Sequence, residues 1–337
     1  IHTLPYLGES EMEALISILE KNDCLGPNLT PKTHKERMIE FKKSYGRQLL
    51  VALYETTMGQ PFSDIIYDEY ASIYPQQAKD IYLTICTLNR MRVPVRVGLI
   101  SRIYDVSFSD FKKNFFNPLE KIVLTISSDG YDKHFTARHP EIAEIVFQRA
   151  LDNHIDRFNE YIRILGKLNI SYESDKASFR SLIRAKTLDK LFPDFKDVNS
   201  IYEHALEVIG EDPYLLQQIA NFERVRESGN LDKALSLLEL AREKAPYDQS
   251  IIHTLAVVWR EKASNVEDTT SKNKYRGESR ALLQNIQDKW GKNSYITSEL
   301  IMLALDGLEE LLNDDSVSAR TIDESIRDIE KLLVEAK

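Results

Sequence analysis

The sequence predicts a mainly α-helical protein: a helical segment, a winged helix-turn-helix with one β-hairpin, and then an array of helical hairpins of the tetratricopeptide repeat (TPR) type. Three observations indicate this fold. The 337 residues include only 12 Gly and 11 Pro, too few for a turn-rich β protein. One Asp-Gly pair, Asp129-Gly130, separates two β-rich runs within residues 121–137. Finally, small and apolar residues repeat at a fixed interval in the second half of the chain.

Composition sets the outer limits. Hydrophobic residues make up 42% of the chain, enough for a sizeable core, and the length suggests two or three packed units. The net charge of −9 does not suit a general nucleic-acid binder. No run of 18 apolar residues occurs, so we expect no membrane span and no membrane partner. Cys24 and Cys86 are expected to be buried thiols in the reducing cytoplasm. Since the chain starts at Ile1 and lacks signal-peptide features, we expect a cytoplasmic fragment of a longer protein.

Residues 1–77 form the first predicted domain, which is helical. Ser10 to Glu13 has the spacing of a capping box, and Leu15 to Leu19 supplies an apolar face. A second helix is expected over 48–54 and ends at Gly59-Gln60-Pro61. A third, short helix is expected over 62–72.

Residues 78–150 are predicted to be the winged helix. Helices are expected over 78–89, from Pro94 to Ile103, and over 107–116. The β-hairpin follows, and Pro140 then opens a helix over 141–151. Three helices followed by a β-hairpin is the order of a winged helix-turn-helix.

Residues 151–196 are read as a helical linker, and residues 197–337 as TPR-like repeats with a C-terminal cap. One unit has the small-residue and proline spacing of the second TPR helix, with Pro246 closing it. A polar insertion is expected over 265–274, and two closing helices over 294–312 and 318–335. The repeat itself aligns residues that are 36 positions apart: Ala205, Asp212, Leu216 and Ala220 with Ala241, Asp248, Ile252 and Ala256.

Motifs for common catalytic sites are absent from the sequence. There is no G-x-x-x-x-G-K-[ST] phosphate loop, no Cys or His pair at zinc spacing and no G-x-S-x-G nucleophile elbow. We therefore expect no catalytic residue, no metal ligand and no complete active site within this chain.

The winged helix raises the question of DNA binding. Residues 78–116 carry seven Lys or Arg against three Asp, a local charge of +4. The helix over 107–116 would be the reading helix, but it contains four Phe and offers only Lys112, Lys113 and Asn114 for contacts. DNA is therefore not the expected partner, and the alternative is a winged helix used as a packing module.

His139 is the sharpest candidate for a ligand contact. It lies between the hairpin and the helix that begins at Pro140. A histidine there could donate from a ring nitrogen to a phosphate beside the helix N-terminus. The alternative is a local helix cap or a core histidine.

In the repeats, aromatic residues are candidates for contacts with a protein partner on a concave face of 197–292. They are Tyr214, Phe222, His253 and Trp259, several of which are expected to belong to the core.

The order of domains resembles the C-terminal half of a STAND ATPase, the signal-transduction NTPases that include NACHT and NB-ARC proteins. The phrases at 46–53, 68–70 and 137–143 are similar to those of bacterial STAND-like proteins linked to anti-phage defence, some of which carry an N-terminal effector domain such as a SIR2-type domain.

This resemblance implies a helical lid over residues 1–77, with Pro5 near its start as a nucleotide-site residue. It implies that Arg138 and His139 contact the phosphate of ADP or ATP, since Arg138-His139-Pro140 lies where the family has an MHD-type motif. This chain has Arg for the Met and Pro for the Asp of that motif.

The resemblance also implies a switch. ATP or ADP with Mg²⁺ would bind an upstream nucleotide domain, a protein trigger such as a phage product would bind the repeats, and the activated protein would form a homo-oligomer. Two other interpretations stay open: a TPR scaffold without a nucleotide role, and a STAND-type transcription regulator.

Overall fold

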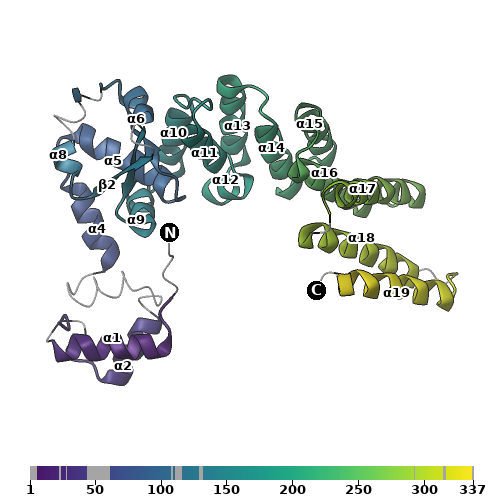
Figure 1. Cartoon of the computed structure of the whole chain (residues 1–337), viewed down its shortest axis with the longest axis horizontal. Coiled ribbons are helices and arrows are strands. Elements are labelled where there is room, and N and C mark those ends of the chain that lie inside the picture. Colours follow the sequence, from purple (N-terminus) through teal and green to yellow (C-terminus); the bar gives the residue numbers. More distant parts are fainter. Residues whose placement is uncertain are drawn as a thin grey trace. The chain divides into compact units, whose positions relative to one another are not determined.

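The computed structural model describes residues 6–22, 24–27, 29–43, 61–107, 109–110, 116–128, 132–291, 293–313 and 316–335 (Figure 1). The chain divides into two compact units, Ile1–Asp152 and Asn153–Lys337. Helices dominate both units, and a small three-stranded sheet lies in the first. The predicted mainly α-helical fold is confirmed.

The first two helices pack against each other and form a small core of their own. Helix α1 (Glu9–Lys21) begins after Gly8, whose N–H donates to the Glu11 carboxylate at 2.6 Å. The predicted cap spacing from Ser10 to Glu13 is therefore wrong by two residues. Helix α2 (His34–Lys43) was not predicted, because it is short and carries many charges. The shared core consists of Met12, Ile16, Leu19, Leu29 and Phe41.

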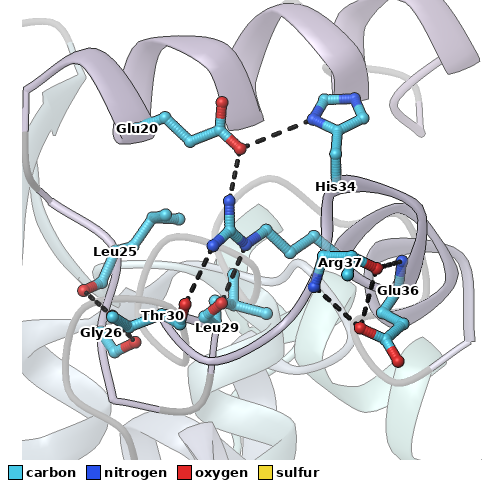
Figure 2. A network of polar contacts seen from close by, with 9 residues as sticks. Glu20, Leu25, Gly26, Leu29, Thr30, His34, Glu36 and Arg37 are labelled. Atoms are coloured by element: carbon cyan, nitrogen blue, oxygen red, sulfur yellow. Dashed lines mark hydrogen bonds and ion pairs between the residues drawn. The ribbon is translucent and has the colours of Figure 1, made fainter.

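Arg37 of α2 ties the connecting loop to α1, as Figure 2 shows. Its Nε donates to the carbonyl of Leu29 at 2.8 Å, and one Nη donates to the carbonyl of Thr30 at 3.1 Å. The other Nη pairs with Glu20 of α1. Three directions of one guanidinium are thus occupied, which only the planar fork of arginine allows.

The rest of the first unit contains two of the three helices expected for the winged helix, although the helix expected from Pro94 begins at Val97, followed by the β-hairpin. Helix α4 agrees with the short helix expected over 62–72, and the helix expected over 48–54 lies outside the described residues. Most of the predicted reading helix over 107–116 also lies outside them. The elements are α4 (Phe62–Ala71), α5 (Gln76–Asn89), β1 (Val95–Arg96), α6 (Val97–Tyr104), α8 (Phe116–Leu119), β2 (Val123–Ser128), β3 (Asp132–Ala137) and α9 (Pro140–Ala150).

The predicted hairpin is confirmed, and the sheet gains one strand. Strands β2 and β3 pair antiparallel in the register Val123↔Ala137 to Ser128↔Asp132. Strand β1 pairs with the other edge of β3, so the order is β1-β3-β2. The buried side chain of Asn89 accepts a hydrogen bond from the Ala137 N–H at 3.2 Å, which joins β3 to the end of α5.

In the described residues of the second unit, all regular secondary structure is helical. Helices α14 and α15, α16 and α17, and α18 and α19 form successive hairpins. Helix α17 begins at Thr269, so the second half of the predicted insertion over 265–274 is helical. The helices are α10 (His154–Leu165), α11 (Glu173–Leu182), α12 (Ala185–Leu191), α13 (Phe195–Ile209), α14 (Pro213–Val225), α15 (Leu231–Lys244), α16 (Gln249–Ser264), α17 (Thr269–Trp290), α18 (Ser294–Leu312) and α19 (Ala319–Glu335).

The 36-residue repeat has a plain structural meaning. Asp212 accepts hydrogen bonds from the N–H groups of Tyr214 and Leu215, at 3.0 and 3.1 Å, and caps α14. Asp248 caps α16 in the same way. The aligned alanines are fully buried, which lets neighbouring helices approach closely.

Two of the expected domain borders divide packed elements. Helix α4 packs against α9, although a border was placed between residues 77 and 78. Likewise α12 packs against α13 and α14, across the expected border at 196. Cys86 is buried as expected, whereas Cys24 is exposed, so the expectation for Cys24 is wrong. Within the described part of the chain, no helix is long and apolar enough to cross a membrane.

Candidate functional site

The first candidate site is the junction between β3 and α9, where Arg138 and His139 lie. His139 has an extended backbone and caps α9: its Nδ1 accepts a hydrogen bond from the Glu141 N–H at 3.1 Å. A ring whose Nδ1 accepts carries its proton on Nε2 when it is neutral. The exposed His139 ring thus acts as a local cap, which was the alternative interpretation, and its Nε2 can still serve as a donor.

Arg138 is committed to an ion pair. Its guanidinium pairs with Glu69 of α4, and the two side chains are 28% and 35% exposed. A second pair joins Arg149 of α9 to Asp64 of α4. The two pairs thus hold α4 against α9 and against the residue that follows β3. A phosphate contact by Arg138 would have to compete with Glu69. Pro5, the third predicted nucleotide-site residue, lies outside the described residues.

Glu69→Gln should loosen α4 without unfolding the unit. Removing one charge of a half-buried pair is expected to cost about 1 kcal/mol, because the remaining hydrogen bond is weaker and solvent screens the charge. Hydrogen exchange of the α4 amides should then speed up about fivefold. Asp68→Asn is the matched control, since Asp68 is exposed on the same helix. Equal protection in both variants would show that the Arg138–Glu69 pair does not hold α4.

The second candidate site is a surface of the repeats formed by the first helix of each hairpin, α14, α16 and α18. We call it the first-helix face. It consists of Tyr214 and Arg224 of α14, Ser250, His253, Arg260 and Glu261 of α16, and Tyr295, Glu299 and Asp306 of α18, together with the buried Gln217 and Thr254 that link α14 to α16.

Polar bonds link these three helices from one repeat to the next. Gln217 donates to the hydroxyls of Ser250 and Thr254, both at 2.9 Å, and Arg224 pairs with Glu261 at 2.6 Å. Arg260 then pairs with Glu299 and with Asp306, both at 3.1 Å.

Arg224 and Arg260 are 36 residues apart, so they occupy equivalent positions in the repeat. Each arginine pairs with a carboxylate on the first helix of the next hairpin. These pairs fix the spacing between neighbouring helices of the first-helix face. These arginines were not singled out from the sequence, although the repeat offset would have found them.

Two of the four residues predicted to bind a partner serve mainly as core. Phe222 is 1% exposed and packs on the Tyr202 ring at 5.9 Å between centroids, so no partner can reach it in the folded state. Trp259 is half-buried, packs against the core and stacks on Tyr275 at 5.3 Å. The partner-binding prediction is therefore wrong for Phe222.

The other two residues lie on the first-helix face. Tyr214 is half-buried, and its hydroxyl donates to the Arg180 carbonyl at 3.3 Å. Burial lowers the pKa of His253 below its ordinary value, and the nearby Glu299 and the Tyr295 backbone only partly oppose this. His253 is therefore neutral at neutral pH. Tyr295, which is 77% exposed, offers the face a free aromatic ring that the sequence reading missed.

Glu223 fixes the turn between α14 and α15. Its side chain is completely buried, and it binds Lys233 at 2.7 Å and Arg226 at 2.6 Å. It also accepts a hydrogen bond from the Asn230 N–H at 3.3 Å. Burial opposes ionisation, but the hydrogen bonds from Lys233 and Arg226 outweigh it, so the pKa of Glu223 is lowered.

This lowered pKa predicts an acid-sensitive repeat unit. A carboxyl group with a depressed folded-state pKa contributes stability above its unfolded-state pKa, about 4.3, and loses it as the pH falls through the folded-state value. Glu223→Gln should therefore lower the free energy of unfolding by about 2 kcal/mol at pH 7. In urea titrations the gap between variant and wild type should shrink below about pH 4. A gap that stays constant down to acid pH would contradict the assignment.

No protein-family model, no curated protein and no solved structure matches this chain. Among the residues that the structure describes, no group of His, Cys, Asp or Glu could hold a metal ion.

Proposed function

We propose that this chain recognises a protein through the first-helix face of its repeat unit, as the trigger-sensing part of a larger switch. The observation that carries this proposal is the polar ladder from Gln217 and Arg224 through Arg260 to Asp306. It fixes three helices side by side, so their outward side chains form a preorganised surface. Binding to such a surface loses less conformational entropy than binding to a flexible one.

Photo-crosslinking tests this proposal. A photoreactive amino acid replaces Tyr295 on the first-helix face, and in a second variant it replaces Tyr247, which is 74% exposed in the turn between α15 and α16. Both variants are irradiated in bacterial cells with and without phage infection. We expect a discrete protein adduct from position 295 and none from position 247. No adduct at 295, or the same adduct at both, would contradict the proposal.

A second candidate function is nucleotide-dependent regulation of the STAND type, in which ADP holds the winged helix closed and the trigger favours the open state. It is favoured by one observation, the exposed His139 ring whose Nε2 remains a donor at the start of α9. A ligand shifts such a switch only if it binds one state better than the other. The link to antiviral defence and to oligomerisation belongs to this candidate.

Nucleotide retention tests the role of His139 in a protein that carries this chain together with its nucleotide-binding domain. His139→Asn keeps a side chain that can cap α9 but removes the imidazole donor. His139→Ala removes both. If the ring contacts a phosphate, both variants should release ADP faster than wild type. ADP release from His139→Asn at the wild-type rate would show that His139 is only a cap.

A further inference from the structure

A groove opens between α17 and α19, with α18 as its floor. Its volume is about 770 Å³, within the size range of ligand sites. The floor is formed by Ala304, Gly307 and Leu311, which are partly exposed and carry no charge. Glu310 of the groove follows Asp306 by one helical turn, so the groove borders the first-helix face on α18 but does not include Glu299 or Asp306. We call it the α17–α19 groove.

Two glycines line the groove at positions where neither the backbone conformation nor the packing requires a glycine. Gly277 and Gly307 lie inside α17 and α18, where a glycine costs about 1 kcal/mol relative to alanine. Neither has positive φ, and a Cβ on either would meet no atom within 4 Å. Their backbones therefore need no glycine for local packing. What the two glycines do provide is room for a second backbone to approach these helices.

One wall of the groove is basic. Lys272, Arg276 and Arg280 lie at four-residue spacing on α17, so they form one row. Lys272 and Arg276 share a single carboxylate, that of Glu310, with Lys272 at 2.8 Å.

The cations of the groove outnumber its carboxylates. Its lining holds three cations against two carboxylates, Glu310 and Asp328, which leaves an excess of one positive charge. The chain as a whole carries a net charge of −9, so this excess runs against the overall balance. In addition, the buried Arg276 Nε finds no acceptor among the described residues.

We infer that the α17–α19 groove binds an acidic amphipathic helix of a partner protein. Its apolar side would lie on Ala304 and Leu311, close to Gly277 and Gly307, and its carboxylates would face Lys272, Arg276 and Arg280. Helices that dock into grooves use an apolar face in this way, and small residues permit close approach. Nucleic acid fits less well, because the uncharged floor of Ala304, Gly307 and Leu311 offers no donor to its phosphates. This inference does not depend on the first-helix face.

The probe is a synthetic fluorescent helix of 14 residues with Leu and Ala on one face and Glu on the other, and its twin has Lys in place of Glu. Fluorescence polarisation at low and at physiological salt measures both against the whole chain. We expect the acidic helix to bind at least tenfold more tightly than its twin, and more weakly as salt rises.

Three variants locate the site. Gly277→Leu should abolish binding of the acidic helix by filling the groove, while thermal stability stays equal or rises because a glycine leaves a helix. Arg280→Glu should weaken binding about tenfold or more by reversing one charge of the row. Lys274→Glu is the matched control on an exposed position of α17 that does not line the groove. No binding by wild type, equal binding of both helices, or binding that Gly277→Leu leaves intact would overturn the inference. None of these results affects the crosslinking expected from position 295, so this inference and the proposed function can fail separately.

Discussion

Gly229→Ala is expected to destabilise the repeat unit by about 3 kcal/mol, because the new methyl group has no room. A Cβ at position 229 would lie 1.7 Å from the carbonyl oxygen of Glu223 and 3.1 Å from that of Arg226. Both obstacles are backbone atoms, so no side chain can turn away to relieve the clash. The turn from Arg226 to Asn230 would have to move, and the hydrogen bond from the Asn230 N–H to Glu223 would break with it.

The measurement is urea unfolding of wild type and variant followed by circular dichroism. Gly277→Ala is the control. Its new methyl group meets no atom within 4 Å, and the substitution removes a glycine from a helix. It should raise the free energy of unfolding by about 1 kcal/mol. The two Gly→Ala changes should therefore have opposite signs. A loss below about 0.5 kcal/mol at position 229 would contradict the clash, because surface changes commonly fall in that range.

The features that could be predicted from sequence are those that depend on local spacing. The repeat of Ala, Asp, Leu and Ala at 36 residues marks caps and close helix contacts, and each can be recognised within one hairpin. The Asp129-Gly130 pair likewise indicates two flanking strands. Strand β1 was missed because two residues, Val95 and Arg96, carry no alternation, and only pairing with β3 defines them.

The candidate sites were harder to predict because they depend on partners far apart in the chain. Arg138 was assigned to a phosphate, but its partner in the structure, Glu69, is 69 residues away, and no spacing rule links them. The cap made by His139 was foreseen as an alternative because the residues involved are adjacent. Aromatic residues at helical spacing suit a core and a binding face equally well, so sequence alone could not separate Phe222 from Tyr295.

Alanine substitutions can distinguish the two aromatic residues, since Phe222 and Tyr295 should differ in their effects on stability and on binding. Phe222→Ala is expected to lower the free energy of unfolding by about 3–5 kcal/mol, the usual cost of removing a buried aromatic ring and leaving a cavity. Phe222 is 1% exposed and packs on Tyr202, whose hydroxyl donates to the Ile183 carbonyl at 3.2 Å. The cavity would therefore open where α13 and α14 meet, and Tyr202 would lose packing as well.

Tyr295→Ala is the matched change on the first-helix face. Its ring is 77% exposed, so the loss of stability should stay within about 0.5 kcal/mol. Thermal unfolding of both variants gives the comparison, and crosslinking from position 214, at the α14 end of the same face, gives a binding readout in each background. At a temperature where Phe222→Ala is still folded, its adduct yield should equal that of wild type, whereas Tyr295→Ala should reduce the yield. An adduct yield that falls in Phe222→Ala but stays at the wild-type level in Tyr295→Ala would contradict this assignment. The buried ring at position 222 cannot reach a partner in the folded state.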